Sequence, residues 1–181
     1  MRVSPPLCSL PGITLRPLTA ADVPDWFAYL SIPAVTEHTS WELHGAQTLM
    51  ALVREYESAD SRSALRFAIV DGCRAALAGT IGLHSISSAD RRGEIAYDLA
   101  PSYWGRGIVT ALCAAVAHWS FESLALQRVQ ATVLVTNTRS ERVLERCGFA
   151  CEGLLRGYRR VRGRPGDFKM FARLAGETPA T

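Results

Sequence analysis

The sequence predicts an α/β (α+β) fold, with strands and helices mixed along one chain. Short apolar runs with the two-residue alternation of strands are separated by longer segments whose apolar residues recur every three to four positions, as in helices. Gly, Pro, Asp and Asn mark the junctions between these segments. A chain of 181 residues with 48% hydrophobic and 20% charged residues can bury one core. We therefore expect a single domain over residues 1–181, with its core at 13–174 and loosely attached tails at 1–11 and 175–181.

The first half of the chain is predicted to contain a strand, two helices and three further strands. Residues 13–18 have a strand pattern, and Thr19 is a suitable N-cap for the helix that follows, through residue 30. Pro33 is expected to break that helix, and a second helix is predicted from about Ala46 to Glu57. Strands are expected at 65–70, 76–86 and 92–100, with an Asp71-Gly72 turn between the first two.

The second half is predicted to contain a helix, a strand, a second helix and two closing strands. The first helix has apolar residues at Ile108, Leu112, Val116 and Trp119, and residues 129–135 alternate as a strand. The remaining expectations are a helix at 139–146, capped by Asn137 or Thr138 and ended by Gly148, and closing strands around 151–161 and 168–174, joined by a turn at Pro165-Gly166. The predicted order is β-α-α-β-β-β-α-β-α-β-β.

Residues 103–110, Tyr-Trp-Gly-Arg-Gly-Ile-Val-Thr, have the features of a pyrophosphate-binding loop. Gly105 and Gly107 lie at a strand-to-helix junction, where glycine lets the backbone approach a ligand and direct its N–H groups at it. The positive end of the following helix favours an anion there, and Arg106 adds a positive charge. The Walker spacing is absent, and a dinucleotide fingerprint would need glycine at Thr110. These residues predict a site for a phosphorylated carrier.

A second motif spans residues 137–149 and contains Asn137, Ser140 and the pair Gly148-Phe149. Together the two motifs resemble those of the GNAT superfamily of acetyl-CoA-dependent N-acetyltransferases. Trp104 stands at the usual Gln/Arg position and Val109 at the usual Gly/Ala position. A bulky residue at the position of Val109 also occurs in the branch that acetylates ribosomal-protein N-termini on serine or alanine. The resemblance implies a mixed, mostly antiparallel central sheet of about seven strands flanked by helices.

The resemblance also implies which residues contact the cosubstrate acetyl-CoA. The loop should hold the pyrophosphate, and Asn137 and the helix after it should border the pantetheine arm. Backbone N–H groups near Asp98 and Leu99 are expected, by analogy, to polarise the thioester carbonyl. No metal is expected. The assigned cofactor-binding residues are Leu99, Trp104, Gly105, Arg106, Gly107, Ile108, Val109, Thr110, Asn137 and Ser140.

Glu94 is the leading candidate for the base that deprotonates the acceptor ammonium, because it lies on the strand before the phosphate loop. In several acetyltransferases that the chain resembles, the base stands at this strand position. The alternative is a structural pairing of Glu94 with Arg91 or Arg92. Asp98 could act as the base only if the strand bulges. His84 could also titrate in the useful range, although a lone strand histidine usually serves a local hydrogen bond, and we interpret His118 as structural.

The departing thiolate needs a hydrogen-bond donor or an acid. Many family members use a tyrosine on the helix after the Asn, and Leu144 occupies the matching position here. Ser140 is the replacement that the ribosomal-protein branch suggests, and it would donate a hydrogen bond to the sulfur. The alternative role of Ser140 is to cap the helix.

Acceptor choice is expected to depend on a loop after the first helix and on the closing hairpin. His38, Ser40 and Trp41 form a polar and aromatic cluster, and we also place Tyr97 against the acceptor. Trp41 could equally cap the core. The hairpin segment 156–164 carries five arginines in nine residues. It is interpreted either as a solvated face or as a basic rim for an acidic protein or ribosomal surface.

Composition excludes several other classes of protein. No segment is long and apolar enough to span a membrane, and the N-terminus lacks the apolar region of a secretory signal. Five cysteines without Cys-x-x-Cys pairing argue against a zinc site or a disulfide framework and indicate the cytoplasm. A net charge of +3 does not indicate nucleic-acid binding. A homodimer stays an open alternative.

The function predicted from these residues and from the resemblance is acetyl-CoA-dependent N-acetylation by direct attack of a primary amine. The absence of a cysteine at the catalytic position of either motif disfavours a covalent enzyme intermediate. The expected acceptor is the N-terminal amine of a (ribosomal) protein. The alternatives are a small amine, such as a polyamine, an amino acid or an aminoglycoside, and a non-catalytic acetyl-CoA sensor.

Overall fold

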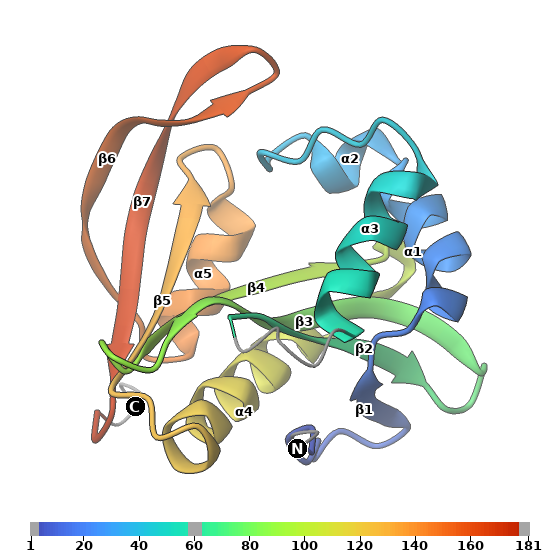
Figure 1. The fold of residues 1–181 in the computed structure, drawn as a ribbon, viewed down its shortest axis with the longest axis horizontal. Coiled ribbons are helices and arrows are strands. Elements are labelled where there is room, and N and C mark those ends of the chain that lie inside the picture. Colours follow the sequence, from blue (N-terminus) through green and yellow to red (C-terminus); the bar gives the residue numbers. More distant parts are fainter. Residues whose placement is uncertain (1–3, 58–62, 178–181) are drawn as a thin grey trace.

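A computed structural model describes residues 4–57 and 63–177. Seven strands form one sheet in the order β1-β2-β3-β4-β5-β7-β6, and every neighbouring pair is antiparallel except β4 and β5 (Figure 1). The predicted fold class, a mixed and mostly antiparallel sheet flanked by helices, is therefore confirmed. The strands are β1 (Ile13–Pro17), β2 (Leu65–Asp71), β3 (Ala76–Ser87), β4 (Arg92–Leu99), β5 (Arg128–Leu134), β6 (Ala150–Val161) and β7 (Arg164–Leu174).

Helices cover both faces of the β1–β4 half of the sheet, with α1 and α3 on one side and α4 on the other (Figure 1). Their buried residues, such as Trp26 and Leu112, form one apolar core with the strands. No helix within residues 4–57 and 63–177 is long and apolar enough to cross a membrane. The helices are α1 (Val23–Leu30), α2 (Pro33–Thr36), α3 (Ala46–Glu57), α4 (Ile108–Ser123) and α5 (Thr138–Arg146), with short 3₁₀ turns at Ala20–Asp22 and Pro101–Tyr103.

The parallel pairing of β4 and β5 lasts for only three residues, from Arg92 opposite Arg128 to Glu94 opposite Gln130. Beyond that point β4 continues to Leu99 and β5 to Leu134, and the two strands diverge (Figure 1). The helices α4 and α5 follow these two strands in the chain, so both begin at the open end. In sheets with parallel strands, ligands bind in the crevice beyond the carboxyl ends of such strands.

Most predicted elements are present within one or two residues of their expected bounds, but one turn was misplaced. The first helix ends at Leu30, before Pro33, as expected, and Pro33 is the first residue of the short α2, a position where its missing N–H costs nothing. The β6–β7 hairpin turns at Arg162-Gly163, not at Pro165-Gly166. Both turn residues have positive φ, 48° and 75°, as a two-residue hairpin turn of the favoured hand requires.

The predicted tails lie partly outside the described residues, at 1–3 and 178–181. Of the remainder, Cys8 and Leu10 are half-buried against the core, and the Ala175 N–H donates to the Gln127 carbonyl. All five cysteines are free thiols.

Asp98 on β4 organises a buried polar network between the sheet and α1. Its carboxylate accepts hydrogen bonds from Arg66 Nη2 at 2.5 Å, Thr80 Oγ1 at 2.7 Å and Trp26 Nε1 at 3.2 Å, and from the Tyr29 hydroxyl. The Arg66 and Asp98 side chains are only 7% and 12% exposed. A buried charge without its partner is strongly destabilising, so both members are needed.

We predict that Asp98→Asn lowers the free energy of unfolding by about 3–5 kcal/mol, because it leaves the buried Arg66 guanidinium without a counterion. Asp90→Asn is the matched control: Asp90 pairs with Arg92 at 3.4 Å, with both side chains exposed, so its loss should cost about 1 kcal/mol or less. Urea unfolding of the two variants measures the difference. Equal losses would contradict a structural role for the buried network.

Candidate active site

A cleft of about 700 Å³, the main cleft, lies between the end of β4 and α5, the helix that follows β5. One wall is the end of β4 with the loop that leads into α4, and the opposite wall is one side of α5 along its length. Residues 34–41, which include the end of α2, contribute the remaining wall. The strand divergence thus creates a cavity long enough to connect the phosphate loop with the predicted acceptor loop.

The two glycines of the predicted phosphate loop have a backbone conformation that favours glycine. Gly105 and Gly107 have φ values of 73° and 72°, and a Cβ atom on either would meet no other atom within 4 Å. Gly107 is the N-cap of α4 and supplies no capping side chain. The N–H groups in the first turn of a helix lack intrahelical acceptors, so they remain available to an anion in the cleft.

Neighbouring side chains hold this loop in place. Trp104 Nε1 donates to the Leu99 carbonyl at 2.7 Å, which joins the loop to the end of β4. The Ile108 side chain is buried in the core, whereas Val109 and Thr110 line the cleft and are half-buried. Trp104, despite its departure from the usual residue type, therefore acts as a brace for the loop.

The cationic side chains of the cleft come mainly from α5. Arg139, Arg142 and Arg146 line the cleft, and the Arg139 guanidinium lies 4.8 Å from the centre of the Trp104 ring. Arg106, the predicted cation, instead lies over the Tyr103 ring at 5.4 Å and does not contribute to the cleft wall. The α5 arginines are spaced by three and four residues, which places them on one helix face. That spacing is a sequence signal that our prediction missed.

Tyr97, Asn137 and Ser140 meet where the strands diverge. The Tyr97 hydroxyl and Ser140 Oγ are 2.8 Å apart, and Asn137 Oδ1 accepts from the Ser140 N–H at 3.2 Å. Asn137 is therefore the helix cap, which leaves the Ser140 hydroxyl available to other partners. Burial raises the pKa of Tyr97 well above its usual value, so this phenol stays protonated at neutral pH. Leu144, at the position of the family tyrosine, is buried in the core.

A smaller cavity of about 140 Å³, the side cavity, adjoins the main cleft and shares Tyr97, Asn137 and Ser140 with it. Glu94 lies in its wall and is 5% exposed. Glu94 Oε1 accepts from Thr132 Oγ1 at 2.6 Å and from Arg159 Nη2 at 3.2 Å. The side cavity therefore holds a buried carboxylate beside the junction of the two strands.

His84 lies next to this carboxylate, with Nε2 at 3.8 Å from Glu94 Oε1. Burial lowers the pKa of His84, so its imidazole is neutral at pH 7. His84 is one-third exposed, and Nδ1 lies 3.1 Å from Ser85 Oγ. A proton on the buried carboxylate thus has a basic neighbour that reaches toward solvent.

Two alternative assignments made from the sequence are wrong. Arg91 donates to the Ala125 carbonyl and Arg92 pairs with Asp90, so neither is the partner of Glu94. The β3–β4 register runs unbroken from Leu99 to Glu94, so β4 has no bulge there. The condition under which Asp98 could act as the base is therefore not met. Asp98 is committed to its structural network. His118 is exposed on α4, away from both cavities.

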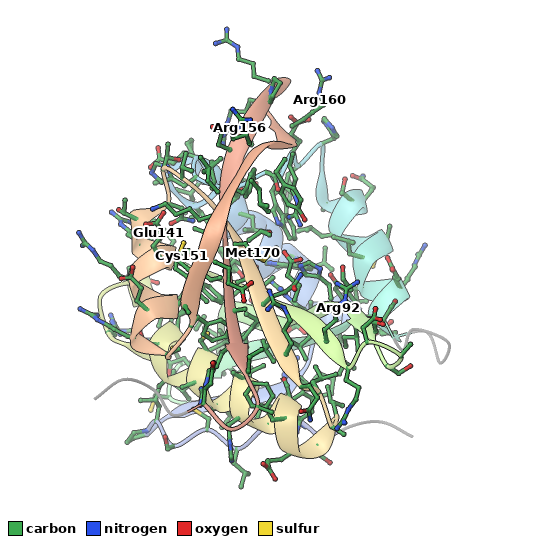
Figure 2. All side chains as sticks on the ribbon, turned by 90° about the vertical axis from the view of Figure 1, so that its left-hand side faces the viewer. Arg92, Glu141, Cys151, Arg156, Arg160 and Met170 are labelled. Carbon is green, nitrogen blue, oxygen red and sulfur yellow. The ribbon has the colours of Figure 1, made fainter. Side chains whose placement is uncertain are left out.

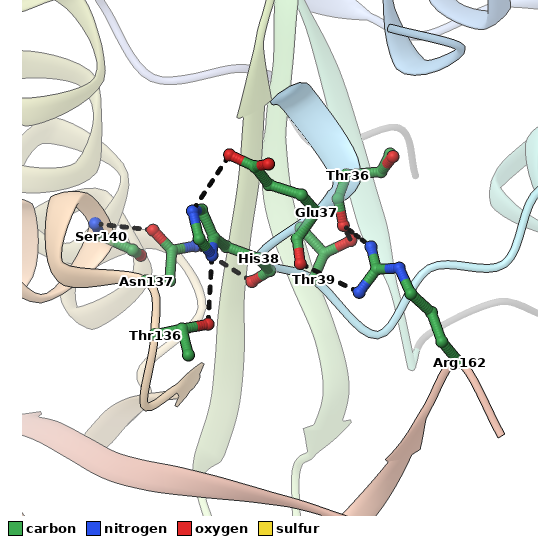
Figure 3. A network of polar contacts seen from close by, with 8 residues as sticks. All are labelled: Thr36, Glu37, His38, Thr39, Thr136, Asn137, Ser140 and Arg162. Atoms are coloured by element: carbon green, nitrogen blue, oxygen red, sulfur yellow. Dashed lines mark hydrogen bonds and ion pairs between the residues drawn. The ribbon is translucent and has the colours of Figure 1, made fainter. Parts of the chain in front are cut away.

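Residues 36–41, which we call the bridging segment, connect the two halves of the molecule (Figure 3). On one side Asn137 Nδ2 donates to the His38 carbonyl at 3.3 Å, and His38 Nδ1 is 3.1 Å from Thr136 Oγ1. On the other side Arg162 donates to the carbonyls of Thr36 and Glu37 at 2.6 and 2.9 Å. The segment is thus held by both α5 and the β6–β7 hairpin.

The residues that were predicted to contact the acceptor substrate all border the side cavity. His38, Ser40, Trp41 and Tyr97 contribute to its wall. Trp41 also packs edge-on against the buried Trp26, with ring centres 5.8 Å apart, so it both lines the cavity and caps the core. The two interpretations given to this tryptophan are compatible.

The arginine-rich hairpin does not act as one uniform surface. Arg159 points to Glu94 and Arg162 to the bridging segment, whereas Arg160 donates to the Gly163 carbonyl of its own turn. Arg156 and Arg160 are exposed on the outer part of the hairpin (Figure 2). The exposed arginines therefore fit the interpretation as a solvated face or as a basic rim, whereas Arg159 and Arg162 fit neither interpretation. Both inward contacts join residues more than sixty positions apart, which is why no local pattern indicated them.

No group of three or more His, Cys, Asp or Glu residues suited to a metal ion occurs in the described part of the chain.

Residues 13–150 match the acetyltransferase (GNAT) domain family. An uncharacterized N-acetyltransferase, p20, of Bacillus licheniformis is 31% identical over 169 residues, which cover 91% of this chain and 94% of the relative. The ribosomal-protein-serine acetyltransferase of Escherichia coli is 31% identical over 98 residues, 54% of this chain and 55% of the relative. Among solved structures, spermidine N-acetyltransferase from Vibrio cholerae, in complex with CoA and spermine, superimposes with a TM-score of 0.79 at 25% identity and covers 90% and 95% of the two chains.

The family match spans most of the predicted core and includes both the phosphate loop and the Asn137 motif. The positive-φ glycines and the uncapped start of α4 supply the anion-binding geometry that such a domain needs. The chain therefore belongs to the GNAT acetyltransferase family, and it is an acyltransferase that uses acetyl-CoA.

Proposed function

We propose that this chain acetylates the N-terminal amine of a polypeptide, with a ribosomal protein as the expected kind of acceptor. The observation that carries the proposal is the charge of the side cavity. Glu94 is the one carboxylate among its lining residues, and it is already paired with Arg159. A polyamine carries several positive charges and would need several carboxylates, whereas an α-amine brings only one. The free state of all five thiols is compatible with the reducing cytoplasm, where ribosomal proteins are made.

Acetyl-CoA is assigned to the main cleft. The Gly105–Gly107 loop and the start of α4 would hold the pyrophosphate through backbone N–H groups. Arg139, Arg142 and Arg146 would balance the remaining phosphate charge. The pantetheine arm would follow the divergence between β4 and β5, past Leu99 and Asn137, and bring the thioester to the junction with the side cavity. All of these features line the same cleft, which supports the assignment.

The proposed reaction is direct attack of the amine nitrogen on the thioester carbonyl, with cleavage of the C–S bond. Glu94 takes the proton from the acceptor ammonium, and the neutral His84 is the next acceptor on the way to solvent. The CoA sulfur leaves with the bonding electrons, and the hydroxyls of Ser140 and Tyr97 are placed to donate to it. Beyond Glu94 the edge of β4 that faces β5 has no strand partner, so N–H groups near Asp98 and Leu99 are the proposed donors to the carbonyl oxygen.

A small-amine acceptor is the second candidate, and the similarity to a spermidine N-acetyltransferase supports it. The basic Arg159 and the lack of further acids in the side-cavity wall argue against a polyamine in particular. A non-catalytic sensor of acetyl-CoA would have no need of a buried carboxylate that adjoins the cofactor cleft. Both Glu94 and Ser140 border connected cavities, which favours catalysis.

We expect Gly107→Glu to weaken CoA binding at least about tenfold. The new side chain would enter the open space of the cleft, and its negative charge would oppose the pyrophosphate. Gly176→Glu is the matched control: it also has positive φ and open space around a Cβ, but it lies outside both cavities. Calorimetric titration with CoA measures both variants. Unchanged affinity in Gly107→Glu would remove the loop from the binding site.

We predict that Glu94→Gln lowers kcat by about 10²-fold or more and leaves CoA affinity unchanged, since the amide keeps the shape but cannot accept the proton. Glu152→Gln, which changes a half-exposed carboxylate paired with Arg128, should leave kcat within about threefold. A kcat of Glu94→Gln within about threefold of the wild-type value would assign the base to His84 or to water.

The acceptor class is tested by a competition between peptides and a polyamine. Short peptides that begin with Ser or Ala should have kcat/KM values at least about tenfold above that of spermidine, because an α-amine brings one positive charge to the cavity and spermidine brings three. Acetyl-CoA turnover gives both values under the same conditions. A preference for spermidine would establish the small-amine alternative and reject the peptide acceptor.

A further inference from the structure

The ion pair between Glu94 and Arg159 raises a question about the acceptor. Glu94 is the proposed base, yet its Oε1 already accepts from the Arg159 guanidinium at 3.2 Å. An ammonium that reaches this carboxylate competes with the guanidinium for the same negative charge. The side chain of Glu94 is only 7% exposed. If the ammonium displaced Arg159 from this carboxylate, solvent at Glu94 would do little to offset the lost ion pair.

Arg159 has capacity for a further partner. Its guanidinium carries five N–H donors, and one hydrogen bond, to Glu94, is recorded for it among the described residues. Its planar group lies against the rings of Tyr158 and Phe168 at 5.0 and 5.8 Å, which fixes its orientation at the cavity wall. The side chain is 36% exposed, so the remaining donors are accessible to a molecule in the cavity. A guanidinium in such a position is suited to a carboxylate.

The other groups that line the side cavity cannot replace that carboxylate. Glu94 is its one acidic residue within the described chain, and Asp98 is committed to Arg66 elsewhere. The remaining ionisable groups of its wall, apart from Arg159, are His84, His38 and Tyr97. The histidines bring no negative charge, and burial raises the pKa of Tyr97, so its phenol stays neutral. An acceptor with a single positive charge would therefore leave the cavity with one cation too many. An acceptor with its own carboxylate would convert one ion pair into two.

We propose that the preferred N-terminal acceptor carries a carboxylate side chain in its first two residues, and that Arg159 binds this carboxylate while Glu94 receives the amine. The proposal rests on the polypeptide acceptor proposed above. Three contacts separate the two groups of the acceptor: amine to Glu94, Glu94 to Arg159 at 3.2 Å, and Arg159 to the carboxylate. The amine and the carboxylate would therefore lie at most about 9 Å apart, three hydrogen-bond lengths. A side-chain carboxylate on residue one or two of a peptide can reach that separation from the α-amine. Arg159 is thus a specificity-determining residue, set in place by the hairpin.

The experiment compares peptides that differ only in charge at one position. Two matched pairs begin Ser-Glu against Ser-Gln and Asp-Ala against Asn-Ala, with identical neutral remainders. For the wild type, the acidic member of at least one pair should have the higher kcat/KM by about tenfold or more, the range of a hydrogen bond to a charged group. The difference should lie mainly in KM and should shrink as salt rises.

Variants of the hairpin separate the proposed contact from a structural role. Arg159→Gln should abolish the preference: kcat/KM for the acidic peptide should fall relative to that for the amide peptide until the two values differ by less than about threefold. Arg159→Lys should restore part of the preference because it keeps the charge. Arg160→Gln, two positions from the turn, removes a neighbouring charge that bonds only to Gly163 and should keep the preference intact. Calorimetric titration with CoA confirms that each variant is folded and binds the cosubstrate.

The outcomes are distinguishable. If the wild type acetylates the peptides of both pairs without preference, or if Arg159→Gln lowers both members of a pair equally, the specificity role of Arg159 is rejected while the peptide acceptor stands. If no peptide is acetylated and spermidine is, the proposed function fails and this inference fails with it. The wild-type comparison decides the matter even if Arg159→Gln does not fold.

Discussion

The early divergence of β4 and β5 is the constraint on which the rest of this structure depends. Three residues of parallel pairing hold the sheet together, and the remainder of both strands has no partner across the gap. Unpaired strand edges in a protein interior carry unsatisfied N–H and C=O groups. Here the gap is a cleft, so those groups face a space that a bound molecule can fill. Because α4 and α5 follow these strands, the divergence also brings two helix N-termini to the same end, and a helix N-terminus favours an anion.

Two carboxylates on one face of β4 show how environment separates structural and chemical roles. Glu94 and Asp98 are four residues apart, so the strand period directs both side chains to the same face. Asp98 is surrounded by donors from α1, β2 and β3, and its oxygens are fully occupied. Glu94 has donors from β5 and β6 instead and borders an open cavity. Asp98 stabilises the β1–β4 half of the sheet. Glu94 lies where β4 meets β5, at the start of the other half.

The sequence predicted the features that depend on local chemistry. Gly105 and Gly107 were expected at a strand-to-helix junction, and they lie directly before α4. Asn137 or Thr138 was expected to cap the next helix, and Asn137 does so. The order of strands and helices followed from periodicity and is also present. It did not predict the contacts of Arg159 and Arg162, because these depend on how the β6–β7 hairpin folds back over β4 and the bridging segment. The turn was misplaced at Pro165-Gly166 because glycine and proline mark turns in general, whereas Gly163 satisfies the specific φ that a two-residue hairpin requires.

The acceptor side of the site is assembled from parts that are remote in sequence. The side cavity takes Trp41 from the bridging segment, Glu94 from β4, Thr132 from β5 and Arg159 from β6, so its shape depends on the position of both halves of the sheet. Asn137 and Arg162 hold the bridging segment from opposite sides through its carbonyl groups, which leaves its side chains free to vary without loss of these contacts. Under the proposed function, such an arrangement separates two requirements: the backbone frame sets the geometry of transfer, and the side chains at the cavity wall set the chemistry of the acceptor. The family similarity to enzymes with different acceptors is compatible with that proposal, in which the main cleft holds the cosubstrate and Arg159 contacts the acceptor.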